Sequence, residues 1–252
     1  MDSFWIYPAL FLTGLSAGFV DSIAGGGGLI TVPVLLSLGL SPADALGTNK
    51  LQACFGSGSA TWQYGRARLI SWKDCRNGVL FTAIGAIAGT LLVQRLNPEL
   101  LRQAIPVLLI GIAFYLLFRP NLGAIRTAAR VEPGPFHFWA GLALGFYDGF
   151  FGPGTGSFWA MAYVILLGYD LTRATAHTKV MNFTSNLGSL VIFLLGNHVL
   201  FRAGIIMGAG QLLGARLGSR AVIEKGGRLI RPIFIVVVIL ISLKLLYQSL
   251  RT

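Results

Sequence analysis

The chain has 252 residues, 54% of them hydrophobic and only 12% charged, whereas a soluble domain carries about 25% charged residues. The formal net charge of +11 would suit a nucleic-acid partner, but the lysines and arginines gather in short loops, as in the cytoplasmic loops of membrane proteins. Because no basic helix or aromatic-studded basic surface is predicted, we expect no nucleic-acid partner. The composition favours a lipid bilayer as the surroundings of the chain.

Apolar stretches long enough to span a bilayer begin close to the N-terminus. Residues 4–40 contain one charged side chain, Asp21, and residues 78–94 contain none; a spanning helix needs about 20 apolar residues. The first stretch lacks the basic start and cleavage site of a signal peptide, so we interpret it as a membrane span. In chain order, the sequence predicts helical segments at 4–23, 28–39, 43–65, 77–95 and 99–118.

A second set of segments follows a charged link at 119–135. This divides the chain into a first transmembrane repeat at 1–118 and a second at 136–252. The fold class predicted is all-α, a polytopic transmembrane helix bundle with broken or re-entrant helices at glycine-rich turns. The segments of the second repeat are predicted at 136–151, 155–168, 172–197, 203–220 and 229–249.

The two repeats share a sequence pattern. Gly14-Leu-Ser-Ala-Gly-Phe-Val-Asp21 returns as Gly141-Leu-Ala-Leu-Gly-Phe-Tyr-Asp148, and further along Lys50 aligns with Lys179. An ordered series of such matches indicates duplication. Two loops that are not equivalent, 66–76 and 220–231, are strongly basic. Inverting the second repeat places both in the cytoplasm and both termini outside. This inversion follows if each repeat crosses the membrane five times, and re-entrant short segments would change that number.

Four ionisable side chains fall inside predicted spans, namely Asp21 and Asp148, and Lys50 and Lys179. Each costs at least about 2.5–3.5 kcal/mol at a helix centre, which makes it a functional candidate by default. One interpretation is that Asp–Lys ion pairs merely hold broken helices together. We favour the other, in which the lysines face a polar cavity and attract an anion, while the aspartates set the local charge or couple protons.

A glycine-rich turn follows each aspartate. Glycine lets the backbone unwind, and the helix that follows points free N–H groups and its positive dipole end at the turn. Two such ends would form a cradle for an oxyanion. The GxxxG pairs that begin at Gly14, Gly85, Gly141 and Gly210 are interpreted as helix packing instead. The residues of the turns are Gly25, Gly26, Gly27 and Gly28 in the first repeat, and Gly152, Gly154, Thr155 and Gly156 in the second.

Polar side chains around the lysines complete the candidate substrate site. Cys54 lies four residues after Lys50 and hence on the same helix face, where its thiol would meet a sulfur-containing substrate; it equally suits an ordinary packing position. His177 fits a proton relay or a hydrogen-bonded packing role. The further candidates are Thr48, Asn49, Gln52, Thr178 and Asn182.

Enzyme templates do not fit this sequence. The glycine run lacks the Lys-Ser/Thr of a P-loop and does not follow a strand of a dinucleotide-binding fold. The histidines, His137, His177 and His198, lack zinc-ligand spacing, and there is no Gly-x-Ser-x-Gly elbow. We therefore expect no enzyme activity, no metal, no cofactor and no ATP-driven pumping. No disulfide is expected between Cys54 and Cys75.

The segment Gly18-Phe-Val-Asp-Ser-Ile-Ala-Gly-Gly-Gly-Gly-Leu-Ile, followed by Pro33 and by Gly47-Thr-Asn-Lys-Leu-Gln, resembles the TauE/SafE family of sulfur-compound permeases. The likeness covers nearly the whole chain, including the Asp148 and Lys179 region. It implies transport of sulfite, thiosulfate or sulfonates across the bacterial inner membrane. The residues carried over from the family pattern are the glycine turns, Asp21, Asn49, Lys50, Asp148, Thr178 and Lys179.

Together these features predict a secondary transporter of a small anionic sulfur compound, working by alternating access between the two repeats. A passive anion channel is one alternative. An accessory membrane subunit of a sulfur-metabolising complex is another. Whether the chain forms a homo-oligomer stays open, as do the substrate, the direction of transport and the coupling ion.

Overall fold

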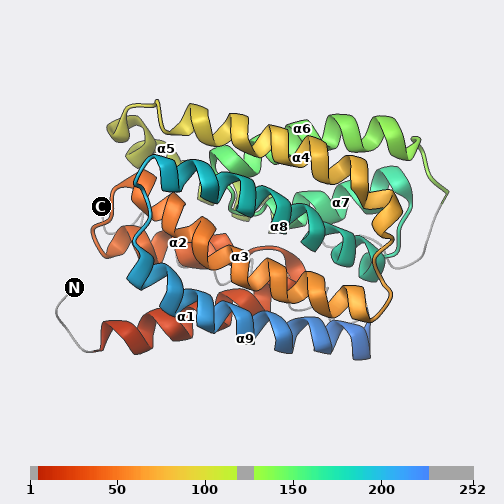
Figure 1. Ribbon diagram of the computed structural model, residues 1–252, viewed down its shortest axis with the longest axis horizontal. Coiled ribbons are helices and arrows are strands. Elements are labelled where there is room, and N and C mark those ends of the chain that lie inside the picture. Colours follow the sequence, from red (N-terminus) through yellow and green to blue (C-terminus); the bar gives the residue numbers. More distant parts are fainter. Residues whose placement is uncertain (1–4, 118–127, 227–252) are drawn as a thin grey trace.

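The computed structural model describes residues 5–117 and 128–226, and within these ranges the chain forms nine α-helices and no strand (Figure 1). The predicted all-α bundle is therefore confirmed. The segment predicted at 229–249 and most of the link at 119–135 lie outside the described residues. The helices are α1 (Ile6–Ala24), α2 (Gly27–Ser37), α3 (Pro42–Arg66), α4 (Trp72–Val93), α5 (Pro98–Leu117), α6 (Pro133–Phe150), α7 (Thr155–Leu167), α8 (Leu171–Leu195) and α9 (Phe201–Lys225).

Two helices extend by five residues past the bounds that the sequence predicted. Helix α4 begins at Trp72 rather than at residue 77, and α9 continues to Lys225 rather than ending at residue 220. Both predictions stopped where charged residues begin. In the extra turn of α9, Arg220 Nε lies 2.7 Å from Glu224 Oε1, and both side chains are exposed. Charged side chains are compatible with a helix end because they reach water there.

The GxxxG glycines allow two pairs of helices to pack backbone to backbone, as predicted. A Cβ added at Gly14 in α1 would overlap the backbone of Met207 in α9, and one at Gly18 would overlap that of Gln211. In the same way, Gly85 and Gly89 of α4 lie against the backbone of α6. Small residues permit this close approach between helices.

Contacts at successive positions fix the directions of the helices. Gly14 and Gly18 meet Met207 and Gln211 in the same order, so α1 and α9 are parallel. The same order of contacts makes α3 parallel to α9, and makes α4, α6 and α8 parallel to one another. Helices α3 and α8 run in opposite directions, because Gly47 meets Phe193 whereas Gly58 meets Phe183.

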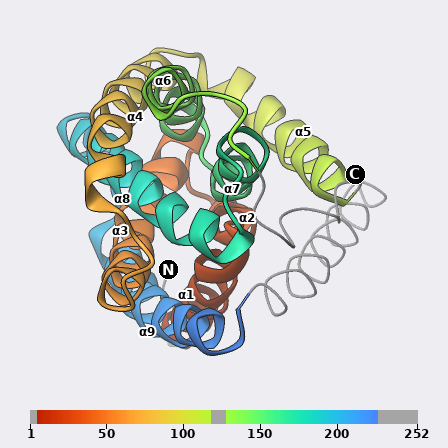
Figure 2. The ribbon, with the colours of Figure 1, turned by 90° about the vertical axis from the view of Figure 1, so that its right-hand side faces the viewer.

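The short helices α2 and α7 each turn back beside the helix before them. Residues 38–41 connect the end of α2 to the start of α3, which lies at the end of the bundle where α1 begins. Residues 168–170 likewise return α7 to the start of α8. Seen end-on in Figure 2, the α4–α6 pair and the α1–α9 pair lie at opposite edges, with α3 and α8 between them.

Polar and charged side chains lie among the apolar residues of the interior, while many large apolar side chains face outward. Lys50, Lys179 and Gln52 are buried, whereas leucines and isoleucines such as Leu80, Ile205 and Leu217 are exposed. This distribution suits a surface that contacts lipid rather than water. Among the described helices, α1 and α4 are long and apolar enough to cross a membrane by length and composition alone.

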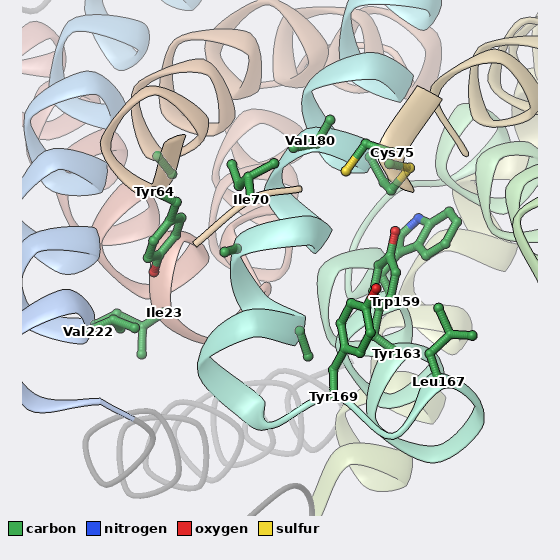
Figure 3. Packing of buried hydrophobic residues seen from close by; sticks show 14 of the residues in the cluster. Ile23, Tyr64, Ile70, Cys75, Trp159, Tyr163, Leu167, Tyr169, Val180 and Val222 are labelled. Atoms are coloured by element: carbon green, nitrogen blue, oxygen red, sulfur yellow. The ribbon is translucent and has the colours of Figure 1, made fainter. Parts of the chain in front are cut away.

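An aromatic cluster fixes the position of α7. The rings of Trp159 and Tyr163 stack with centroids 5.6 Å apart, and those of Tyr163 and Tyr169 stack at 5.5 Å (Figure 3). All three side chains are buried. Because buried aromatic pairs stabilise packing beyond the area they bury, they hold α7 against the bundle. The glycine turn before α7 is positioned in this way.

Candidate functional site

The two glycine turns meet in the middle of the bundle. Gly25 has φ 76°, and Gly152 and Gly154 have φ 94° and 84°, a region that glycine alone enters freely. A Cβ on Gly25 would lie 2.5 Å from the carbonyl carbon of Gly156, and one on Gly156 would lie 2.6 Å from Cα of Gly25. Ser157 links the turns further, since its hydroxyl donates to the carbonyl of Ala24 at 2.8 Å.

The intramembrane lysine of each half forms an ion pair with the aspartate of the other half. Lys50, on α3, places Nζ 2.6 Å from Oδ1 of Asp148 at the end of α6. The same ammonium donates to the Asp148 carbonyl at 2.5 Å and to Asn186 Oδ1 at 3.3 Å. The hydroxyl of Ser185 also donates to the Asp148 carboxylate. This pair is enclosed, with side-chain exposures of 1% for the lysine and 5% for the aspartate.

The second pair repeats this arrangement with fewer contacts. Lys179, on α8, donates to the carbonyl of Asp21 and places Nζ 3.1 Å from Asp21 Oδ2. Asp21 Oδ1 accepts a hydrogen bond from the Gly27 N–H at 3.2 Å, at the start of α2. The lysine is fully buried, but the Asp21 side chain is 20% exposed. The two ion pairs therefore differ in their access to solvent.

A small polar cavity of about 30 Å³ lies between the glycine turns. On this scale a water molecule needs roughly 10–15 Å³, so the cavity has room for a few waters or an ion of a few heavy atoms. Asp21 and Asp148 line it, whereas Lys50 and Lys179 lie behind them. The other lining residues are Gly25, Gly27, Gly28, Asn49, Ala53, Gly152, Gly154, Thr155, Gly156, Asn182, Asn186 and Gln211.

The cavity wall is rich in hydrogen-bond donors. Helices α2 and α7 begin at it, after Gly26 and Gly154. In their first turns the N–H groups of Gly27, Leu29, Thr155 and Ser157 are bonded to Asp21 Oδ1 or to nearby carbonyls, which leaves those of Gly28 and Gly156 for a ligand. The first turn of a helix leaves such N–H groups without intrahelical acceptors, and its dipole favours negative charge there. Amide groups of Asn182, Asn186 and Gln211 add donors from α8 and α9.

Asn49 belongs to a buried hydrogen-bond group beside the cavity. Its Oδ1 accepts from the hydroxyl of Thr31 at 2.6 Å and from Nε2 of Gln52 at 2.8 Å. Gln52 is buried and does not line the cavity. Since Thr31 and Gln52 hold the oxygen of Asn49, the amide nitrogen is the atom left to face outward. This group fixes the orientation of the Asn49 side chain, which lines the cavity.

Other sequence candidates lie away from the cavity. The Thr48 hydroxyl accepts from the Leu200 N–H at 3.0 Å and ties α3 to the start of α9. His177 Nδ1 donates to the Arg173 carbonyl at 2.9 Å, while its Nε2 accepts from the Ser71 N–H at 3.2 Å. His177 thus joins α8 to the α3–α4 connection. Gly26, Thr178 and Cys54 are not among the lining residues either; Cys54 and Cys75 are both free thiols.

Sequence reasoning missed Asn186 and Gln211, which line the cavity, and Ser185, which bonds to Asp148 in its wall. Asn186 and Ser185 follow Lys179 by about two helical turns, and Gln211 lies between two glycines already assigned to packing. A Cβ on Gly56 would overlap Oε1 of Gln211, so this glycine makes room for the glutamine. A polar residue within an apolar segment was the available signal for Asn186 and Gln211.

Comparisons with known proteins identify relatives of the chain. A family model described as sulfite exporter TauE/SafE matches residues 10–245. A probable membrane transporter protein, YfcA of Escherichia coli K12, is 50% identical over 95% of this chain and 89% of its own length. Another, ORF9 of Sinorhizobium sp., is 45% identical over 97% of this chain and 94% of its own. No solved structure matches the chain.

Proposed function

Since the chain belongs to the TauE/SafE family of membrane transporters, we propose that it is a secondary transporter of a small anionic sulfur compound across the bacterial inner membrane. The observation that carries this proposal is the donor-lined cavity between the contacting glycine turns at Gly25 and Gly156. The sulfur chemistry comes from the description of the matching family model. Sulfite, thiosulfate and a small organosulfonate are the substrates to test.

The cavity chemistry supports an oxyanion as the substrate. An oxyanion loses its hydration shell on entry and needs preorganised donors in exchange, and hydrogen bonds to a charged acceptor are the strong ones. The N–H groups of Gly28 and Gly156 at the N-termini of α2 and α7, together with the amides of Asn49, Asn182 and Asn186, supply such donors. The volume of about 30 Å³ favours a compact anion over a long organic one.

Two carboxylates in the cavity wall repel an anion, and this repulsion provides a means of coupling anion binding to proton binding. Asp21 and Asp148 repel a negative substrate as long as both are ionised. Protonation of one aspartate removes that repulsion and releases its lysine from the ion pair. We assign this role to Asp21, because its side chain is the more exposed and Ser185 adds a hydrogen bond only to Asp148. Lys179 then stabilises the bound anion.

Alternating access requires two states of similar energy, which inverted repeats provide. In our proposal the two halves are inverted repeats, and α1–α2 and α6–α7 are re-entrant hairpins. The opposite directions of the equivalent helices α3 and α8 support this assignment. It is supported further by the ends of α3 and α9, which lie at one end of the bundle and carry Arg66 and Lys225. Both strongly basic loops then face the cytoplasm.

A binding measurement on the purified protein tests the proposed substrate class. Isothermal titration with sulfite, thiosulfate, taurine and chloride separates sulfur oxyanions from anions in general. Loss of one donor to a bound anion costs about 1.5–3 kcal/mol, so Asn182→Ala should weaken sulfite binding roughly tenfold or more. Asn77→Ala, an exposed asparagine on α4, is the matched control. Equal affinity in both variants would contradict the assigned site.

A further inference from the structure

A second hollow, which shares no lining residue with the central cavity, lies at the start of α4. This groove has a volume of about 320 Å³ and lies between α4 and α8. Its apolar wall is formed by Cys75, Val79 and Val180, and Figure 3 shows Cys75 and Val180 next to each other in this region. The remaining lining residues, Trp72, Lys73 and Arg76, belong to the first turns of α4.

The charge at the mouth of the groove is positive and unneutralised. Lys73 and Arg76 are exposed, and neither forms an ion pair with any residue that the structure describes. The carboxylate between them in the sequence, Asp74, is directed toward Arg173, with 3.5 Å from its Oδ2 to the arginine Nη2. The groove therefore offers two cations to an external anion.

Trp72 places the groove at the boundary of the bilayer. Its side chain is 58% exposed and its ring lies against Gly65 at the end of α3. An exposed tryptophan next to Lys and Arg at a helix end is typical of the membrane–water interface. The apolar wall then faces the hydrocarbon region, while the cations face the headgroups.

We propose that this groove binds an anionic phospholipid, with the phosphate between Lys73 and Arg76 and an acyl chain along Val79 and Val180. A soluble anion would use the cations and leave the apolar wall uncovered, whereas a zwitterionic lipid would bring its own cation to the two basic residues. An anionic lipid neutralises the two basic residues with its phosphate and covers the apolar wall with an acyl chain. Each basic residue near the surface favours an anionic lipid by about fivefold. The proposal does not depend on the substrate assigned to the central cavity.

Brominated lipids test this proposal, because bromine on an acyl chain quenches a tryptophan in contact with it. The full-length protein is placed in nanodiscs of phosphatidylcholine that contain a fixed fraction of brominated phosphatidylglycerol or brominated phosphatidylcholine. Subtracting the emission of Trp72→Phe isolates Trp72. We expect several-fold stronger quenching of Trp72 by the anionic lipid, and loss of this preference in the double variant Lys73→Gln, Arg76→Gln.

Matched variants make the result decisive. Arg102→Gln removes an exposed cation at the other end of the bundle and should keep the preference. The charge-preserving double variant Lys73→Arg, Arg76→Lys should also keep it, which separates loss of charge from misfolding. Equal quenching by the two lipids in the wild type would overturn the proposal, as would a preference that survives the glutamine variant. Competition by soluble glycerol phosphate would instead assign the groove to a free phosphate.

Discussion

Asp21 and Lys179 form the more open of the two ion pairs that join the halves, with 3.1 Å between Oδ2 and Nζ. The Asp21 side chain is 20% exposed, against 5% for Asp148 in the equivalent pair. Gly56 occupies the position in the first half that Ser185 occupies in the second. Asp21 therefore lacks the hydroxyl donor that Asp148 has, and the sequence itself encodes part of the asymmetry.

This asymmetry predicts different outcomes for the two Asp→Asn substitutions. Asp21→Asn should fold and exchange labelled substrate across liposomes, but its uptake should no longer respond to an imposed pH gradient, because the proton-binding carboxylate is gone. Asp148→Asn should instead be unstable, since Lys50 is left enclosed without its carboxylate. Uptake at several imposed gradients, together with thermal unfolding, distinguishes the two. Gradient-driven uptake that persists in Asp21→Asn would assign the coupling to another group.

The enclosed pair predicts a strong coupling in a double-mutant cycle. Removing one partner of a buried ion pair typically costs about 3–5 kcal/mol, whereas replacing both with apolar residues is often near neutral. Lys50→Met should thus lower the thermal unfolding temperature markedly, and Lys50→Met with Asp148→Leu should recover most of the loss. Chemical denaturation in detergent or bicelles measures the cycle. Additive losses would mean that the two residues do not stabilise each other.

The contact of the glycine turns predicts that Gly25 is far less replaceable than another glycine of similar conformation. Gly25 and Gly39 have φ 76° and 82°, but a Cβ on Gly39 would meet nothing within 4 Å. A left-handed alanine costs about 1–2 kcal/mol at either position. Only Gly25→Ala also forces apart Gly25 and Gly156, so transport should be lost in this variant and kept in Gly39→Ala. Equal loss in both variants would attribute the effect to backbone strain alone.

The helix directions predict that both basic loops are reached from one side of the membrane. In a background with Cys54 and Cys75 replaced by serine, cysteines at Arg68 and Lys225 should react with an impermeant maleimide only after the cytoplasmic side is opened. A cysteine at Arg202, at the opposite end of the bundle, should react in intact spheroplasts. Labelling of Arg68→Cys and Lys225→Cys from different sides would contradict the inverted arrangement.

The sequence was most informative where one physical rule decided the outcome. Charge-free stretches located the helices, and the GxxxG spacing predicted that Gly14 and Gly85 lie at close helix contacts. Helix ends were less accurate, because Lys73 and Arg220 lie on helices whose charged turns leave the apolar region. Whether the halves are inverted remains a prediction.

Within the site, residue type was easier to predict than orientation. Asp21, Asp148, Asn49, Asn182 and the glycine turns line one cavity. The two lysines lie behind the aspartates, an arrangement closer to the ion-pair interpretation than to the one we favoured, and spacing along a helix could not reveal a partner from the other half. His177 contacts a loop that periodicity does not describe. To predict that Gln211 lines the cavity, one would have to know which helix packs beside Gly56.

Transport by the purified protein tests the central claim most directly. Liposomes that contain only this protein are given ³⁵S-labelled sulfite or thiosulfate with and without an imposed pH gradient. The account predicts saturable movement of the sulfur anion that the gradient drives beyond equilibrium and that Asn182→Ala weakens. Absence of transport, or a non-saturable flux that merely equilibrates the anion, would contradict a coupled transporter and favour an accessory subunit or a channel, respectively.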